Sequence, residues 1–200
     1  MILYIVITYL KAILKRKIVL SREFNLLMFV APIAVLFDGI TAWTVNHMNI
    51  VPELHDIGKI ATPDSILQKP GKLSNEEYEI MKEHATQGGK IIRQIFYNLD
   101  DMQFRNIAYE IARFHHEKYN GKGYPDGLAG EQIPLHARIM AIVDVFDAVS
   151  QKRCYRDAMT IDESFFIIEK GIGTDFDPHL AQIFLDNKDE VIKLMKQLED

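Results

Sequence analysis

The sequence of 200 residues contains a single cysteine, Cys154, and a single tryptophan, Trp43. One cysteine excludes a disulfide framework and a cysteine-based zinc finger, and it agrees with a reducing compartment. The chain also lacks an excess of positive charge, since its formal net charge is −5. Because no global basic character points to nucleic acid, we expect no DNA partner.

Uninterrupted apolar runs of the length of about 20 that a spanning helix needs are also lacking: residues 1–14 and 25–37 are shorter, although the second run extends through Trp43 if Asp38 is tolerated. Residues 1–50 carry a net charge of +3 and residues 51–200 a net charge of −8. This shift predicts a boundary near residue 50, between an apolar, basic segment (1–50) and a domain (51–200). Residues 1–45 are either membrane-associated or a pair of core helices, and we expect a cytoplasmic catalytic part.

No alternating strand pattern of useful length appears after residue 50, so the sequence predicts an all-α fold. Ser74 and Glu77 form a capping box that opens a helix ending near Phe96. Further helices are expected up to His115, from Pro134 to Ser150, from Asp162 to Gly171, and from Asp177-Pro178 onward, the last continuing through Val191 and Met195. Loops rich in glycine and proline lie at 69–72 and 121–130.

Ligands for a metal ion recur along this helical pattern: His55-Asp56, His84, His115-His116 and Asp144. Imidazole and carboxylate together suit iron, manganese or zinc. Adjacent residues of one helix point about 100° apart, so both reach one site only at a helix end or between two metals. A two-metal centre can clamp a phosphodiester. Each residue taken alone is a weak signal, because a lone histidine is usually a solvated or satisfied side chain.

The ordered set resembles the HD-GYP domain, a subgroup of the HD phosphohydrolase superfamily. The motifs that carry the resemblance are LHDIGKI (54–60), LQKPGKLS (67–74), MKEHATQGG (81–89), ARFHHEKYNGKGYPDGL (112–128), IPLHARIMAIVDVFDAVSQKRCYR (133–156) and FDPHL (176–180). They span about two thirds of the chain. The resemblance implies an all-helical HD-domain bundle with a GYP loop and short C-terminal helices.

The resemblance also implies a metal-dependent phosphodiesterase that hydrolyses cyclic di-GMP. The metal ligands of a binuclear centre, with iron or manganese, would be His55, Asp56, His84, His115, His116 and Asp144, with Asp56 bridging. Lys59 looks like the residue that contacts the scissile phosphate. Arg153 and Arg156 would hold guanine or phosphate, although both also suit a solvated loop. Gly123, Tyr124 and Pro125 form the GYP loop, whose role would be structural or the binding of a partner such as a diguanylate cyclase.

The chain departs from the family before the HD motif, where the family carries helices that bring a further histidine. His47 and Glu53 are the nearby ligand types, and neither sits at family spacing. The domain is therefore expected to be shortened at its N-terminus. Three hypotheses follow: a cyclic di-GMP phosphodiesterase, a hydrolase of another nucleotide phosphoester, or a signalling module without catalysis.

Overall fold

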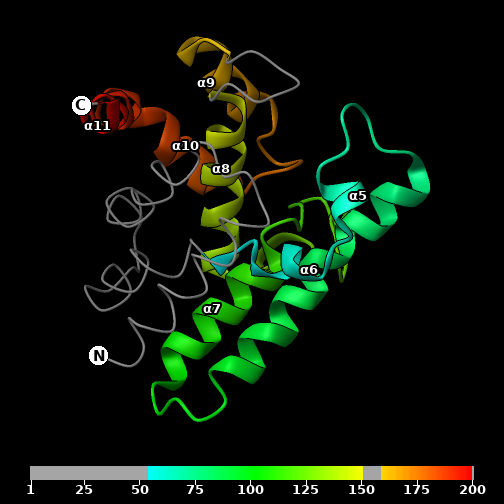
Figure 1. Cartoon of the computed structure of the whole chain (residues 1–200). Coiled ribbons are helices and arrows are strands. Elements are labelled where there is room, and N and C mark those ends of the chain that lie inside the picture. The colour runs from blue at the N-terminus through cyan, green and yellow to red at the C-terminus, as the bar shows by residue number, and fades with distance from the viewer. Residues whose placement is uncertain (1–53, 151–158, 200) are drawn as a thin grey trace.

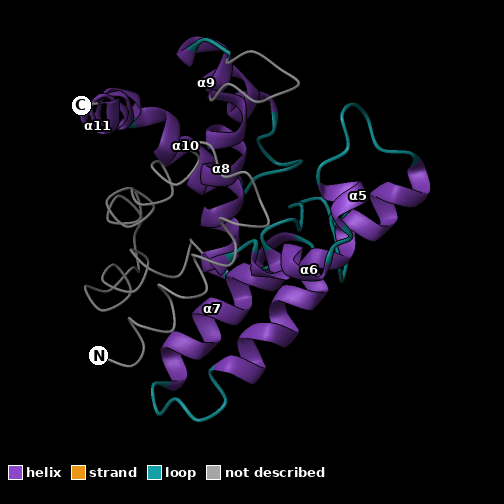
Figure 2. Ribbon diagram, in the orientation of Figure 1, coloured by secondary structure: helices purple, strands orange, loops and turns teal. Residues whose placement is uncertain are grey.

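The computed structural model describes residues 54–150 and 159–199, and within these ranges it contains helices and loops but no strand (Figure 2). The predicted all-α fold is therefore confirmed. In chain order the elements are η2 (Ile57–Ala61), α5 (Asp64–Leu67), α6 (Asn75–Ile95), α7 (Met102–Phe114), η3 (Gly130–Gln132), α8 (Leu135–Ser150), α9 (Ile161–Lys170), α10 (Pro178–Asp186) and α11 (Lys188–Glu199) (Figure 1).

The helix starts follow local capping chemistry. Ser74 accepts a hydrogen bond from the Glu77 amide while the Glu77 carboxylate accepts one from the Ser74 amide, so the predicted capping box of α6 is confirmed. Helix α9 differs from the prediction. Its cap is Thr160, which forms a reciprocal capping box with Glu163, and Asp162 lies inside the first turn. A box satisfies two free amides at once, which explains why the chain begins the helix earlier.

The last predicted helix is in fact two helices. Asp177 caps α10 as expected, by accepting hydrogen bonds from the amides of His179 and Leu180. The helix then ends at Asn187, whose side-chain amide donates to the Ile183 carbonyl at 2.8 Å. Helix α11 starts directly afterwards with Asp189 and Glu190 in its first turn, where carboxylates are favourable. The continuous apolar pattern had concealed this break.

Helices α6 and α7 pack side by side, and α8 connects this pair to α9 and α10 (Figure 1). The core between α8, α9 and α10 contains Phe146, whose ring centroid lies 4.8 Å from that of Phe165 and 5.1 Å from that of Phe184. Arg138 on α8 forms an ion pair with the buried Asp177 at the start of α10. The short helix η2 packs on α6. This arrangement fixes the ends of η2, α6, α7 and α8 relative to one another.

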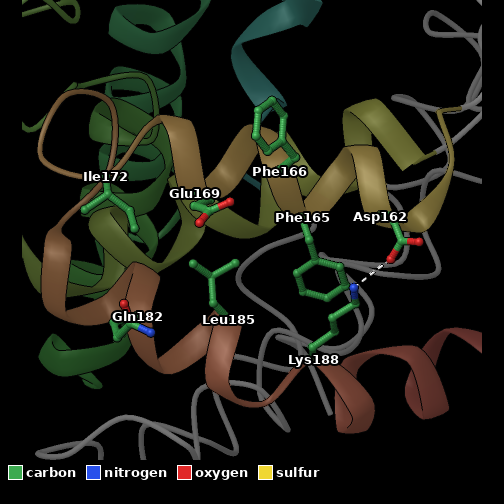
Figure 3. A pocket seen from close by; sticks show the side chains of 8 residues that line it. All are labelled: Asp162, Phe165, Phe166, Glu169, Ile172, Gln182, Leu185 and Lys188. Atoms are coloured by element: carbon green, nitrogen blue, oxygen red, sulfur yellow. Dashed lines mark hydrogen bonds and ion pairs between the residues drawn. The ribbon is translucent and has the colours of Figure 1, made fainter.

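A hollow lies between α9, α10 and the start of α11 (Figure 3). Phe165, Phe166 and Leu185 line it, and Lys188 forms an ion pair with Asp162 at 2.7 Å on its rim. None of its lining residues is a predicted site residue.

Within the two described ranges, no helix has both the length and the apolar character needed to cross a membrane. The predicted apolar segment 1–50, including the membrane association of residues 1–45, lies outside the described residues.

Candidate metal centre

The predicted ligands come from four places in the chain, two of which are helix ends. His55 and Asp56 precede η2, with Asp56 as its N-cap residue. His115 is the C-cap residue of α7, and His116 follows it. Only His84 on α6 and Asp144 on α8 lie within helices. Placement at a helix end explains how adjacent residues point into one site, as the geometry of a helix requires.

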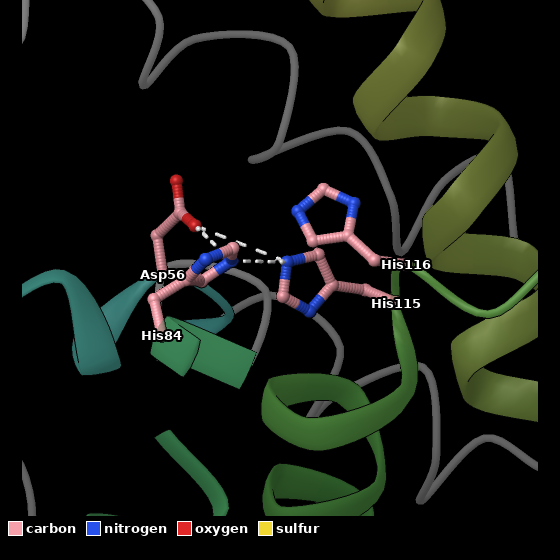
Figure 4. Close-up of side chains that lie close together, drawn as sticks. All are labelled: Asp56, His84, His115 and His116. Atoms are coloured by element: carbon pink, nitrogen blue, oxygen red, sulfur yellow. Dashed lines mark hydrogen bonds and ion pairs between the residues drawn. The ribbon is translucent and has the colours of Figure 1, made fainter. Parts of the chain in front are cut away.

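Four of these residues form a tight cluster. Asp56, His84, His115 and His116 each offer one ligand atom, and these atoms lie within 4.8 Å of one another. The Nε2 atoms of His84 and His115 are 3.4 Å apart, and Asp56 Oδ1 lies 3.4 Å from the former and 3.8 Å from the latter. Figure 4 shows the four side chains converging from η2, α6 and the end of α7.

Backbone contacts orient two of the imidazole rings. His84 Nδ1 lies 2.7 Å from the Met81 carbonyl, and His115 Nδ1 lies 2.9 Å from the Ile111 carbonyl. A carbonyl oxygen only accepts, so both Nδ1 atoms carry the proton. In the neutral rings the Nε2 lone pairs then face each other and cannot form a hydrogen bond. Rings held in this way by their second nitrogen are typical of metal ligands.

The electrostatics keep three of the rings neutral. Burial lowers the pKa of His84 and, together with the neighbouring His116, lowers the pKa of His115 well below its usual value. Burial and the nearby His84 lower the pKa of His116 to about 3. Neutral imidazole is the form that binds metal ions.

Asp56 faces two groups with its two oxygens. Burial opposes its charge, but Lys59 and then His55 hold the pKa of Asp56 well below its usual value. Oδ2 accepts a hydrogen bond from Lys59 Nζ, while the buried Oδ1 has no hydrogen-bond partner among the described residues. A buried carboxylate oxygen without a donor is costly. A cation in contact with Oδ1 would remove that cost.

His55 and Asp144 form the adjoining part of the site. His55 Nε2 lies 3.2 Å from Asp56 Oδ2 and 3.7 Å from Asp144 Oδ1. Burial alone lowers the pKa of His55, but Asp56 and Asp144 together raise it to about 9. The two carboxylates therefore favour the protonated form of this ring, and a metal ion bound there would compete with that proton. All six predicted ligands thus share one neighbourhood, and the donor set of imidazole and carboxylate fits a divalent metal.

The GYP loop lies against this cluster. The ring centroid of Tyr124 is 4.8 Å from that of His116 and 6.3 Å from that of His84. Gly121 adopts a φ of +75°, which favours glycine. Gly123 is needed for another reason, because a Cβ there would lie 2.3 Å from the Lys118 amide nitrogen. Pro125 follows Tyr124 through a cis peptide bond.

Glu117, which follows the two histidines directly, anchors the loop. The residue is 3% exposed, and its carboxylate accepts hydrogen bonds from three loop amides: Asp126 at 2.7 Å, Gly127 at 3.1 Å and Leu128 at 3.0 Å. Arg113 on α7 adds a two-point ion pair with the Asp126 carboxylate. Glu117 is part of the HHE motif in the sequence, but its hydrogen-bond partners could not be predicted because they depend on how the loop folds.

Replacing Glu117 by glutamine is expected to lower the free energy of unfolding by about 1–3 kcal/mol, because an amide nitrogen cannot accept a hydrogen bond and at least one of the three loop amides then loses its acceptor. Urea denaturation measures the loss, and hydrogen exchange should speed up at residues 126–128. Glu131→Gln, at an exposed position of η3, is the matched control. Unchanged exchange at these three amides would show that Glu117 does not anchor the loop.

Arg153 and Arg156 lie outside the described residues. Their predicted roles at the substrate stay predictions, as do the roles of Lys59 and of the GYP loop residues.

The comparisons with known proteins agree with this site. The sequence profile of the HD domain family matches residues 22–180. The match begins within the segment that the charge pattern assigns to a separate N-terminal part, so the boundary near residue 50 stays a prediction.

Three curated relatives are similar over most of this chain. A cyclic di-GMP phosphodiesterase of Vibrio cholerae is 43% identical over 147 residues, which cover 74% of this chain and 30% of that protein. A 3'3'-cGAMP-specific phosphodiesterase 2 of the same organism is also 43% identical, over 74% of this chain and 27% of that protein. A cyclic di-GMP phosphodiesterase of Thermotoga maritima is 36% identical over 81% of this chain and 43% of that protein. The chain thus spans less than half the length of each of these relatives.

The fold is also that of a solved structure. A crystal structure of a cyclic GMP-AMP specific phosphodiesterase of V. cholerae matches with a TM-score of 0.62 and 16% identity, over 90% of this chain and 46% of that one. The profile match, the helical fold and the clustered ligands agree with one another. The chain therefore belongs to the HD domain family, as the HD-GYP resemblance of its sequence predicts.

Proposed function

We propose that this chain is a metal-dependent phosphodiesterase that hydrolyses cyclic di-GMP to the linear dinucleotide, and further to GMP. The observation that carries the proposal is the arrangement of Asp56, His84 and His115. Two imidazole lone pairs and an unsatisfied carboxylate oxygen face one point, and backbone carbonyls hold both rings in place. Curated relatives named for the hydrolysis of cyclic dinucleotides support the reaction class.

The centre is proposed to hold two divalent ions, iron or manganese. One group of ligands consists of His84, His115 and His116 with Asp56 Oδ1. The other consists of His55 and Asp144 near Asp56 Oδ2. Because its two oxygens face the two groups, Asp56 is suited to bridge both ions. When bound, such ions supply Lewis-acid polarisation of a phosphoryl oxygen and a hydrolytic nucleophile at neutral pH.

Lys59 is proposed to act on the scissile phosphate. In the structure its ammonium group donates a hydrogen bond to Asp56 Oδ2, at the edge of the centre. A cation held there can stabilise negative charge that develops on the phosphoryl oxygens or on the leaving oxygen. Hydrolysis adds one water across a P–O bond of the cyclic dinucleotide, and the leaving oxygen takes up a proton.

Substrate binding beyond the centre is assigned to Arg153 and Arg156, whose guanidinium groups suit guanine and phosphate. The GYP loop is proposed as the surface for a partner such as a diguanylate cyclase, since Glu117 and Arg113 hold it in a fixed shape. A cytosolic substrate places the catalytic part in the cytoplasm, with residues 1–45 associated with a membrane or packed on the domain.

Cyclic GMP-AMP is the second candidate substrate. The relative named as specific for 3'3'-cGAMP is as similar to this chain as the relative named for cyclic di-GMP, at 43% identity. The two substrates differ in one base, so the choice depends on contacts to the bases and leaves the phosphodiester chemistry unchanged.

The proposal is tested by turnover of both cyclic dinucleotides with added manganese or iron, with the products separated by chromatography, and by metal content of the purified chain. We expect two tightly bound ions per chain and a linear dinucleotide as the first product. A chain that binds no metal and hydrolyses neither substrate would instead be a signalling module.

Replacing Lys59 by alanine is expected to leave both metals bound and to slow turnover by about 10²–10³, the usual loss for one electrostatic group. Elemental analysis and steady-state kinetics measure the two effects separately. Lys69→Ala removes the same charge from a residue paired with Glu77 in the first turn of α6, and serves as the control. An unchanged rate, or a loss of metal, would exclude the catalytic role of Lys59.

A further inference from the structure

A lysine on α6 lies between two tyrosine rings beside the metal centre. Lys82 Nζ is 5.7 Å from the ring centroid of Tyr78 and 5.8 Å from that of Tyr124. Both distances are within the range of about 6 Å over which a ring attracts a cation. Tyr78 precedes Lys82 by one helical turn, whereas Tyr124 comes from the GYP loop. The lysine is therefore positioned by two separate segments of the chain.

Tyr78, Lys82 and Tyr124 form a row between the protein surface and the metal ligands. Tyr78 is 49% exposed. Tyr124, at the inner end, packs on the ring of His116 at 4.8 Å. Lys82 precedes the ligand His84 by two residues on the same helix. A molecule bound at the centre and extending outward past Tyr124 would meet Lys82 and then Tyr78.

The ammonium group of Lys82 is available to such a molecule. Its ion pair with Glu79, at 2.7 Å, involves a carboxylate that is 68% exposed. Surface pairs of this kind contribute little, so an anionic ligand can replace Glu79 at small cost. Lys59 differs, because its partner Asp56 belongs to the buried cluster. The two lysines therefore suit two different phosphates.

We propose that Lys82 and Tyr78 form a second contact for the cyclic dinucleotide: Lys82 binds the phosphate that is not being cleaved, and Tyr78 stacks on a base. This inference rests on the proposed function. A cyclic dinucleotide carries two phosphates and two bases on one ring, so when one phosphate is at the centre the other half extends beyond it. Stacking of a base on an aromatic side chain contributes about 1–3 kcal/mol by alanine substitution.

The test compares two substrates in Lys82→Gln and Tyr78→Leu. Cyclic di-GMP has a second phosphate and bases, and methyl p-nitrophenyl phosphate has only the phosphodiester to be cleaved. The measured quantity is kcat/KM for the first substrate divided by kcat/KM for the second. We expect this ratio to fall about tenfold in each variant, mainly through a higher KM for cyclic di-GMP. Lys90→Gln and Tyr97→Leu, at exposed positions on and just beyond the same helix, are the controls and should keep the ratio of the unmodified chain.

Three results would overturn the inference, and they are distinguishable. A variant that loses activity on both substrates equally, with a fall in metal content, shows that its residue supports the centre itself and not a contact to the distal half of the substrate. An unchanged ratio with normal rates shows that neither residue contacts the distal half of the substrate. Absence of cyclic dinucleotide turnover in the unmodified chain refutes the proposed function itself, and this inference with it.

Discussion

Replacing Asp56 by asparagine is expected to abolish metal binding and turnover together. The amide keeps the volume of the carboxylate but loses its charge and one acceptor oxygen, and both oxygens of Asp56 face ligand groups. The remaining histidines then lack a shared anion, so two cations would repel each other without screening. We expect turnover of cyclic di-GMP to fall at least about a thousandfold, or about 4 kcal/mol in the activation barrier. Elemental analysis and single-substrate kinetics on the same preparation measure both losses.

Asp100→Asn is the matched control, because Asp100 is exposed in the connection between α6 and α7. It should retain metal and activity. Circular dichroism must show that Asp56→Asn keeps its helices, since a collapsed fold would lose metal for another reason. A folded Asp56→Asn chain with full metal content and turnover would refute the assignment of the centre.

Much of the site could be predicted because its residue types are rare in that order. The structure brings His55, Asp56, His84, His115, His116 and Asp144 into one neighbourhood, although the four elements that position them, η2, α6, α7 and α8, are separated in the sequence. Adjacent ligands were predicted to lie at a helix end or between two metals, and the first alternative agrees with the structure, where Asp56 precedes η2 and His115 ends α7. The residue types in this order, together with the family resemblance, therefore restricted the members of the site, and helix geometry restricted their local placement.

Helix boundaries were less accurate where two signals competed. Thr160 and Asp162 both resemble cap residues, and the reciprocal box with Glu163 decides for Thr160. The apolar periodicity continues across Asn187, so the break between α10 and α11 is visible only in the side-chain bond to Ile183 and the acidic first turn that follows. At α9 one capping signal therefore competed with another, and at Asn187 the capping signal was outweighed by the apolar periodicity.

Contacts between distant segments could not be predicted from the pattern. Glu117 anchors the GYP loop through amides nine to eleven residues further along the chain. The contact of Lys82 with Tyr78 could be predicted, because the two residues are four apart on α6. The contact of Lys82 with Tyr124 of the GYP loop could not. Such contacts depend on how the loop and the helix pack, which composition and spacing do not encode.

A close approach of the backbones of η2 and α6 is another such contact, and it makes Gly58 sensitive to substitution. Gly58 lies in η2, where it is buried against α6. A Cβ at this position would lie 1.8 Å from the His84 carbonyl oxygen and 2.5 Å from the Gly88 amide nitrogen. Both atoms belong to the helix backbone and cannot rotate away. The absence of a side chain at Gly58 therefore lets Asp56 reach His84.

Replacing Gly58 by alanine is expected to lower the free energy of unfolding by about 3 kcal/mol or more, the upper range for overpacking. That is a large part of the 5–15 kcal/mol that stabilises an ordinary domain. Because η2 must move away from α6, Asp56 should separate from His84 and metal affinity should fall as well. Denaturation of the metal-free chain measures the first effect, and metal titration of the folded fraction measures the second.

Gly88→Ala is the control for this position. Its Cβ would lie 3.2 Å from the Ala112 carbonyl oxygen, a tight contact that small shifts relieve. Alanine also stabilises the interior of a helix by up to about 1 kcal/mol relative to glycine, which offsets the cost of the tight contact. We therefore expect Gly88→Ala to change stability by less than about 1 kcal/mol. Equal stability of the two variants would mean that η2 can move away from α6 without loss of stability. The position of His55 and Asp56 would then not depend on Gly58.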